Sequence, residues 1–333
     1  MRKVLWLLLT AVVLYFGYWM IGAKGTEAAI SEWIAARERE GWQAEVAEIE
    51  TKGFPLRFDT EIVEPRFADP RTGAAFSTPR LEILSESHRP TRFTARLANE
   101  VTLASPYQRL EITQDMAEAD LFVAPGPNLT LERAATRIEG FTLASTLDWG
   151  LTIDRAEIMS EQRADAPLTH DITIRAAGVE PTGGLLEQLD PEGLLSDSLD
   201  VADVKIAASF DSAWDIHALE GPRPQPTRVE IETLSLDWGS LSLKVAGEFA
   251  VDTRGYPNGT IAIKAVNWRE MIELAVASGA IPPDMSNLAM RAGQMLANMS
   301  GRKDTIDAEL TLKNGMISMG FIPLGPAPKI ALR

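Results

Sequence analysis

The chain has 333 residues, of which 45% are apolar, so it can form one large domain or two ordinary domains with a packed core. It carries 47 acidic against 32 basic residues, and this acidic balance argues against a nucleic-acid partner and against docking on an anionic membrane face. The absence of cysteine excludes disulfides, thiolate metal sites and cysteine nucleophiles.

An apolar segment opens the chain. The run from Val4 to Ile21 contains no charged residue, and as a helix it would be about 27 Å long, close to the roughly 30 Å hydrocarbon core of a bilayer. Arg2 and Lys3 precede the run and favour a cytoplasmic N-terminus, while two tyrosines and a tryptophan near its far end suit the membrane interface. We predict a transmembrane signal anchor over residues 1–25, with residues 4–21 in a membrane.

Two alternatives stay open for this segment. A cleaved signal peptide usually has an apolar region of roughly 7–15 residues and ends at a small-residue site, for which Ala23 with Gly25 is a weak candidate. A buried core helix is the other alternative. If the segment is an anchor or a signal peptide, everything after Lys24 lies outside the cytoplasm.

Residues 26–52 are predicted to form a stalk helix and a linker. Thr26 is a candidate helix cap, and the apolar side of the helix consists of Ile30, Trp33 and Ile34. We expect the helix to rest on the body of the protein. A dimerising coiled coil is the alternative, although the periodic run is too short for three heptads.

From Gly53 the apolar residues recur with a period of two, which is typical of strands. In the first strand the residues of one face are Leu56, Phe58, Thr60 and Ile62. Further short strands are expected at 107–113, 128–133, 170–177 and 201–210. Residues 53–333 are therefore predicted to form a β-rich domain, built on a large, antiparallel, curved sheet with one apolar face.

The clearest strand alternation lies in the segment 241–252, which turns through GYPNG into TIAIKAV. Its apolar side consists of Leu241, Leu243, Val245, Phe249 and Val251. Near the end of the chain, the Asn314-Gly315 dipeptide favours a two-residue type I′ hairpin. That turn would place Leu312 opposite Ile317 and Leu310 opposite Met319.

Helices interrupt the strands at two places. The segment 185–189 is short and is followed by Pro191. A longer helix is predicted from Asn267, a candidate cap, to Gly279, with Trp268, Met271, Ile272 and Ala275 on its apolar side. A second helix is predicted after Pro283, and its apolar side is expected to hold Leu288, Met295, Leu296 and Met299. The fold class is therefore α+β and β-rich, with a helical pair near the C-terminus.

Two stretches of the chain are nearly alike. TRIEGFTLASTLDWG spans 136–150 and TRVEIETLSLDWG spans 227–239, and the copies differ in length by two residues, which keeps side chains on the same face of a strand. The similarity has two interpretations that the sequence leaves open. It is either a duplicated sheet unit, with sub-units 53–180 and 181–333, or a chance similarity between strands.

Three segments carry a resemblance to a known family: GFPLRFDTEIVEPRFADPRTG at 53–73, LDWGSLSLKVAGEFAVDTRGYPNG at 236–259 and GFIPLGPAP at 320–328. They resemble an alphaproteobacterial family known as the domain of unknown function 2125 family. The resemblance implies a bacterial envelope protein that is anchored in the inner membrane and faces the periplasm, with no established activity. More distantly, the architecture is similar to AsmA-like envelope proteins, which are associated with phospholipid traffic and outer-membrane homeostasis.

The sequence offers no catalytic, cofactor-binding or metal-binding motif. His88, His170 and His217 are far apart and are interpreted as surface or strand residues rather than metal ligands. Asp69, in ADPRTG, fits a turn better than an acid catalyst. No cofactor and no enzymatic activity are therefore predicted, and an envelope hydrolase is a hypothesis without a supporting motif.

Two functions are compatible with these features. The first is a lipid-binding or lipid-transfer protein, with a groove along an apolar sheet face formed by Leu241, Leu243, Val245, Phe249, Ile261 and Ile263. The residues predicted to cover that groove are Met271, Ile272, Met295 and Met299. The second is a non-catalytic interaction protein that presents an acidic surface to other envelope proteins. A packed, dry interior would favour the second function, and an open apolar cavity would favour the first.

Overall fold

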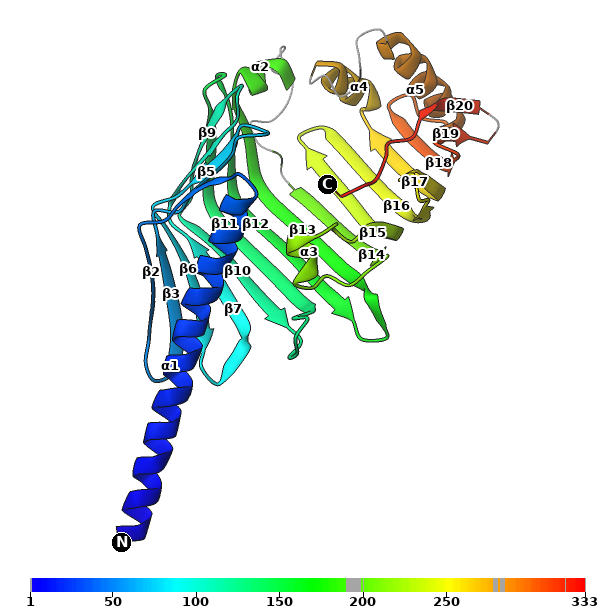
Figure 1. Ribbon diagram of the computed structural model, residues 1–333. Coiled ribbons are helices and arrows are strands. Elements are labelled where there is room, and N and C mark those ends of the chain that lie inside the picture. The colour runs from blue at the N-terminus through cyan, green and yellow to red at the C-terminus, as the bar shows by residue number, and fades with distance from the viewer. Residues whose placement is uncertain are drawn as a thin grey trace.

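A long helix leads into a large, curved, antiparallel sheet (Figure 1). The computed structural model describes residues 2–189, 199, 201–277, 281, 285–320 and 322–332. The helices are α1 (Arg2–Arg39), α2 (Gly184–Leu189), α3 (His217–Glu220), α4 (Trp268–Ala277) and α5 (Ser286–Ser300). The predicted helix ends at Pro191, Gly279 and Pro283 lie outside the described residues.

The sheet contains twenty described strands, and every pairing between them is antiparallel. Strands of its first half are β1 (Gln43–Glu45), β2 (Glu48–Lys52), β3 (Arg57–Val63), β4 (Arg66–Asp69), β5 (Ala74–Ser77), β6 (Arg80–Glu86), β7 (Arg89–Leu97), β8 (Glu100–Ala104), β9 (Arg109–Thr113) and β10 (Met116–Val123). Those of its second half are β11 (Leu131–Ser145), β12 (Trp149–Arg163), β13 (Ala166–Gly183), β14 (Val201–Phe210), β15 (Pro226–Trp238), β16 (Leu241–Val251), β17 (Pro257–Val266), β18 (Thr305–Lys313), β19 (Met316–Met319) and β20 (Ile322–Pro326).

The main run of strands is β2–β3–β6–β7–β10–β11, followed by β12 to β20 in chain order. A shorter second tier, β1–β4–β5–β8–β9, joins the second half of β11, whereas β10 pairs with its first half. Among the described residues no pairing joins β20 to β2, so the sheet is open. The prediction of a large antiparallel sheet with a long N-terminal helix and two helices near the C-terminus is confirmed.

One face of this sheet is apolar across most of its width. The strand register aligns uncharged residues in rows, because alternate residues of paired strands share a face. One row consists of Ile83, Ala95, Ala119, Thr136, Ile158, Ile174, Val204, Leu234, Val245, Ile263 and Ala308. Its neighbour consists of Ile138, Ala156, Ala176, Ala202, Leu236, Leu243, Ala265 and Ile306. We call this the inner face, because α1 and α4–α5 pack on it.

The opposite face carries a ladder of charges. One row, offset by one residue from the apolar rows, consists of Glu82, Arg96, Glu118, Arg137, Glu157, Arg175 and Asp203. Acid and base alternate along most of it, with Arg137 also 3.0 Å from Asp120. Exposed pairs of this kind contribute at most about 1 kcal/mol each. Their main effect is that the charged face is exposed to solvent. The inner face is therefore the one that makes apolar contacts.

Two glycines interrupt the alternation where the second tier begins. Gly140 in β11 and Gly178 in β13 have φ angles of 60° and 62°, and both lie level with Asp154 of β12. A residue with left-handed backbone conformation bends a strand locally, and glycine adopts this conformation without steric cost. Before Gly140 the inward residues of β11 have even numbers, such as Thr136 and Ile138. After Gly140 the less exposed residues are Phe141 and Leu143, so the alternation of inward and outward side chains shifts by one residue at this bend.

We expect Gly178→Val to lower the free energy of unfolding by about 1–3 kcal/mol, because a β-branched residue resists a positive φ. Its Cβ would also clash with Asp154 Oδ2 unless that carboxylate moves. Ala177→Val, at the exposed neighbouring position, is the control and should change stability by less than about 0.5 kcal/mol. Equal urea midpoints for the two variants would contradict this explanation of the bend.

The Asn314-Gly315 hairpin is confirmed. Both residues have positive φ angles, 52° and 75°, as a type I′ turn requires, and Leu312 faces Ile317. The pairing of β18 with β19 ends at Thr311 and Ser318. The predicted pair of Leu310 with Met319 therefore lies just beyond the ladder.

Helix α1 corrects two predictions about residues 26–52. It continues without a break to Arg39, so Thr26 is not a cap, and its hydroxyl donates to the carbonyl of Gly22 at 3.0 Å. The predicted linker contains β1 and β2. The helix contacts β1, β2 and β3, as expected for a stalk helix that rests on the body.

The two similar stretches lie at different places relative to their turns. In the first copy Asp148 lies in the turn and Trp149 begins β12, whereas in the second copy Trp238 ends β15 and the turn follows at Gly239. The suggested boundary between 180 and 181 falls inside β13, which pairs with both β12 and β14. Both candidate sub-units therefore share one sheet, and the duplication itself stays a prediction.

Candidate functional site

Helix α1 covers the inner face at its first strands. The ring of Trp19 stacks on Phe58 of β3 with the ring centroids 5.8 Å apart, and Ala23 completes this buried cluster. Trp19 also donates its indole N–H to the carbonyl of Arg57 at 2.8 Å. Gly22 allows the close approach, because a Cβ there would come within 2.6 Å of the Phe58 ring.

Helices α4 and α5 cover the opposite end of the inner face. Trp268, 2% exposed, packs with Ala265, Leu296, Ala297 and Ile306 in one cluster. Among the predicted groove and cover residues, those that pack against this cluster are Leu243, Ile263, Met271 and Ile272. A second cluster of Val229, Phe249 and Leu312 is covered in part by Ile330 of the C-terminal tail, and Ile261 packs there too.

The six predicted groove residues therefore share one face, but at the covered end of it. Leu241 is buried, and Val245 is half-buried in the same row as Ile158. The predicted apolar side of α5 needs correction. Leu296 is buried in the cluster as predicted, but Leu288, Met295 and Met299 are 46%, 36% and 67% exposed, because α5 turns Leu296 and Ala297 toward the sheet.

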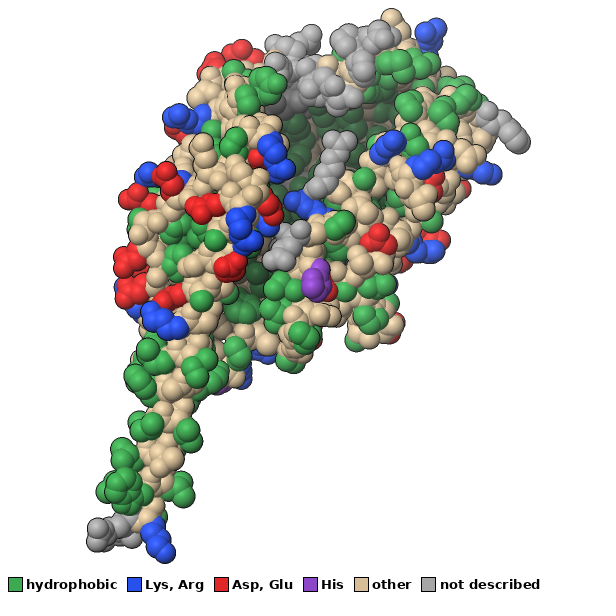
Figure 2. Space-filling view, viewed as in Figure 1, with side chains coloured by type: hydrophobic (Ala, Val, Ile, Leu, Met, Phe, Trp, Pro, Cys, Tyr) green, Lys and Arg blue, Asp and Glu red, His purple; other side chains and the backbone are tan. Residues whose placement is uncertain are grey.

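Between these covers lies a part of the inner face that we call the open floor: the inward residues of β6, β7 and β10 to β13. Among the described residues, no hydrophobic cluster of buried side chains includes them. Most are only half-buried, and Ile158 is 41% exposed although it belongs to a continuous apolar row. Figure 2 shows the corresponding hollow, with hydrophobic side chains at its depth.

A loop crosses the inner face at the end where β11 begins. We call residues 211–216, between β14 and α3, the strap. The carbonyl of Trp214 accepts the amide N–H of Leu131 at 2.7 Å, and the amide of Ile216 donates to the carbonyl of Asn128 at 3.0 Å. The strap thus joins β14 to β11 across β12 and β13. At the far end of the sheet α2 contacts α4, so both ends of the hollow are bridged.

One titratable side chain is buried on the inner face near the strap. His170 is 2% exposed, its Nδ1 lies 3.0 Å from Ser160 Oγ, and its ring meets Phe210 edge-on. Burial lowers the pKa of His170 from its ordinary value near 6.5, and the charge of Asp171 opposes this only in part. The imidazole is therefore held neutral.

This burial predicts a pH dependence of stability. The unfolded chain binds the His170 proton at a higher pH than the folded chain, so the free energy of unfolding should fall as the pH drops below about 6.5. Above that pH the histidine should contribute no slope. His170→Gln should remove its part of the slope in urea unfolding between about pH 7.5 and 5.5, whereas exposed His217→Gln should not. Identical slopes for the two variants would contradict the prediction.

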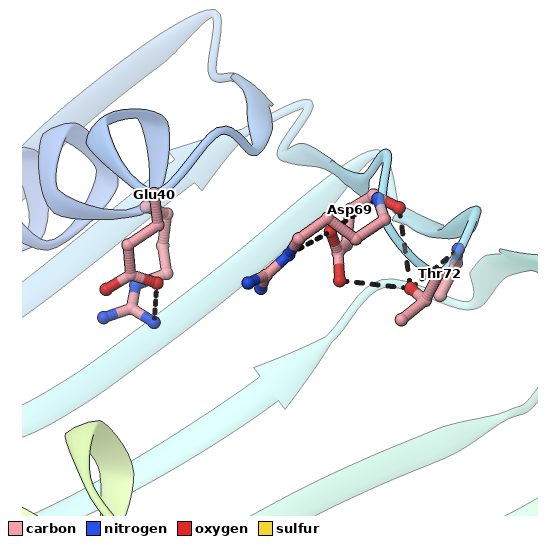
Figure 3. A network of polar contacts seen from close by, with 6 residues as sticks. Glu40, Asp69 and Thr72 are labelled. Carbon is pink, nitrogen blue, oxygen red and sulfur yellow. Dashed lines mark hydrogen bonds and ion pairs between the residues drawn. The ribbon is translucent and has the colours of Figure 1, made fainter.

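The buried acidic side chain of Asp69 has a structural role. Asp69, 6% exposed, accepts the amide N–H of Arg71 at 3.0 Å and the hydroxyl of Thr72 at 3.2 Å, as Figure 3 shows. Those donors, the Arg71 amide above all, hold the pKa of Asp69 below its usual range despite its burial. The carboxylate therefore fixes the β4–β5 turn, as the sequence predicted. Glu40, also drawn, pairs with Arg37 at 2.8 Å.

The described part of the chain holds no group of three or more His, Asp or Glu side chains placed to bind a metal ion. The three histidines lie apart, in the β6–β7 turn, in β13 and at the start of α3. The described residues do form a long apolar surface, partly open, beside an apolar helix.

The open floor itself was missed at the sequence level. Its central residues, Ile158 and Ile174, lie in LTIDRAEIMSEQR and in DITIRA, where apolar and polar residues alternate as clearly as in 241–252. That alternation was the available signal. The sequence could not indicate which part of the apolar face the helices cover.

Residues 19–328 match the bacterial family described as "Uncharacterized protein conserved in bacteria (DUF2125)". The chain belongs to this family. No curated protein and no solved structure matches it. The DUF2125 match begins at Trp19, so the stacking of Trp19 on Phe58 lies inside the matched region, while most of the apolar run precedes it.

Proposed function

We propose that this DUF2125 protein is a membrane-anchored binding protein that holds the acyl chains of lipids on its open floor. The observation that carries the proposal is the set of continuous apolar rows across β6, β7 and β10 to β13, which α1, α4 and α5 leave open and which the strap crosses only at one end. An uncovered apolar surface of this extent is rare on a soluble monomer and marks a binding surface.

The dimensions suit an acyl chain. Six strands at about 4.8 Å spacing make a floor about 24 Å wide, whereas one leaflet contributes about half of the roughly 30 Å hydrocarbon core. Each buried methylene contributes about 0.8 kcal/mol, so a chain that lies across several rows would bind without any specific polar contact. The charged outer face disfavours the same binding on the other side.

Helix α1 is the proposed anchor. Among the described residues it is the one helix that is long enough and apolar enough to cross a membrane. Cleavage near Ala23 would remove Trp19 from its buried contact with Phe58, which favours an uncleaved anchor. With Arg2 and Lys3 in the cytoplasm, the sheet would lie in the periplasm of a bacterium, anchored in the inner membrane. The distant architectural similarity to AsmA-like envelope proteins agrees with lipid transfer, by analogy only.

A non-catalytic interaction protein of the envelope is the second candidate. The observation that favours it is the exposed ladder of alternating charges on the outer face, a surface suited to polar contacts with another protein.

Photolabelling of the full-length protein would test the proposal. The protein is reconstituted in phosphatidylcholine nanodiscs that contain a phospholipid with a diazirine in its acyl chain, and adducts are mapped by peptide mass spectrometry. We expect adducts at Ile158 and Ile174 on the open floor and none at Met159, which is 37% exposed on the outer face. Adducts confined to α1 would overturn the proposal.

A further inference from the structure

Three aromatic residues fix α1 to one end of the sheet. Tyr15 donates its hydroxyl to the carbonyl of Pro55 at 2.8 Å and lies 2.9 Å from Ser87 Oγ. Tyr18 donates to the carbonyl of Ser87 at 2.6 Å, and Trp19 stacks on β3 as described above. The β2–β3 loop and the β6–β7 turn are therefore held at the level of Tyr15. We call residues 53–57 and 87–89 the lower rim; it lies at the lower end of the sheet in Figure 1.

We call the contacts of Tyr15, Tyr18 and Trp19 with the sheet the joint. The joint lies too near the N-terminus of α1 for the whole sheet to lie outside the membrane. From Val4 to Tyr15 the helix rises only about 17 Å, which is little more than half of a roughly 30 Å hydrocarbon core. The apolar run continues for about 9 Å beyond Tyr15, to Ile21. If the whole run lies in the bilayer, the lower rim lies below the surface of the leaflet distal to the N-terminus.

The side chains of the lower rim suit that location. Leu56 is 66% exposed and Phe54 is 48% exposed, while Phe54 meets the rings of Phe16 and Trp19 edge-on at 5.5 and 5.4 Å. Large apolar residues with this exposure are costly in water but favourable in a leaflet. The loop thus extends the apolar surface of α1 sideways.

The charged residues near the rim can reach the headgroup region. Arg57 is paired with Asp59 at 2.9 Å, and Arg89 lies 4.0 Å from Glu86, both with about half of the side chain exposed. Long cationic side chains extend toward lipid phosphates while their stems stay in apolar surroundings. The acidic balance of the whole chain does not oppose this contact, because apolar side chains make it.

We propose that the lower rim is inserted in the distal leaflet, so that the inner face of the sheet opens at the level of the acyl chains. Leu56 lies in the turn that leads into β3, and the inner-face row that begins at Phe58 continues through Ser85, Phe93 and Leu121 onto the open floor. Between α1 over β2–β3 and the strap at β11, the strands β6, β7 and β10 leave an entrance. The occupant of this surface is the bilayer that holds α1, and the inference rests on the proposed anchor and lipid-binding function.

The test uses the absence of native cysteine. Full-length Leu56→Cys, labelled with an environment-sensitive fluorophore, is placed in phosphatidylcholine nanodiscs with or without lipids that carry a doxyl quencher near the headgroup end of the acyl chain. We expect loss of most of the Leu56 fluorescence with doxyl lipid. The control is Tyr107→Cys, 87% exposed in the β8–β9 turn at the other end of β11, which should lose none and should respond to aqueous iodide instead.

A label at position 56 that responds to iodide like the label at 107, and not to doxyl lipid, would overturn the inference. His88→Cys, in the adjacent turn, provides a second site if the Leu56 variant does not fold, and the same two outcomes apply to it. Failure here is distinguishable from failure of the proposed function. A sheet that stands above the bilayer can still take diazirine adducts at Ile158, and an inserted rim can coexist with an unlabelled floor.

Discussion

Replacing Ile158 by glutamate is expected to abolish the lipid adducts on the open floor, whereas Met159→Glu should leave them unchanged. A carboxylate in the middle of an apolar row must keep its water, so an acyl chain loses contact there with three or four methylenes. At about 0.8 kcal/mol each, this loss is about 3 kcal/mol, or roughly a hundredfold in occupancy. The measurement is the yield of diazirine adducts at Ile174, in the same row on the neighbouring strand of the open floor.

Met159→Glu is a closely matched control for Ile158→Glu. It is the next residue of the same strand, its side chain is 37% exposed against 41% for Ile158, and it points to the charged face. Both variants should unfold at similar urea concentrations, because neither replaces a buried side chain. A second inner-face variant, Ile174→Glu, should repeat the effect. Equal adduct yields for Ile158→Glu and Met159→Glu would show that the inner face is not where lipid binds.

Much of the sheet was predictable from local alternation. The strands at 201–210 and 241–252 and the Asn314-Gly315 hairpin agree with the structure, because period two and turn chemistry are written in neighbouring residues. The extent of the apolar face depends on register across many strands, which no short segment encodes. Leu243 and Ile158 have equivalent patterns, yet helices cover the first and leave the second open.

The helices show the same division between local and tertiary information. Amphipathic periodicity predicted α4 and α5, but the choice of Met295 and Met299 as the covering side of α5 assumed that the largest apolar residues face inward. Close packing on Trp268 instead involves Leu296 and Ala297, and Ala297 is fully buried there. The continuity of α1 was missed because Thr26 was interpreted as a cap that begins a second helix, whereas its hydroxyl donates to the carbonyl of Gly22 within one continuous helix.

Trp19→Ala is expected to release α1 from the sheet. The substitution removes a buried indole that stacks on Phe58, together with its hydrogen bond to the carbonyl of Arg57. Losses of this kind cost about 3–5 kcal/mol, enough to shift a docked helix to a largely undocked ensemble. Gly22→Leu should act in the same direction for the opposite reason, because its side chain would have to displace the Phe58 ring.

Pulsed electron paramagnetic resonance can measure this release, with spin labels on cysteines that replace Glu32 of α1 and the exposed Lys264 of β17. The wild-type sequence should give one narrow distance distribution, and Trp19→Ala should broaden it. Trp6→Ala is the matched control, since Trp6 lies on the same helix but is 66% exposed. An unchanged distribution in Trp19→Ala would mean that the tyrosine contacts alone hold the joint. A broadened one would establish that the residue at which the DUF2125 match begins sets the orientation of the sheet on its anchor.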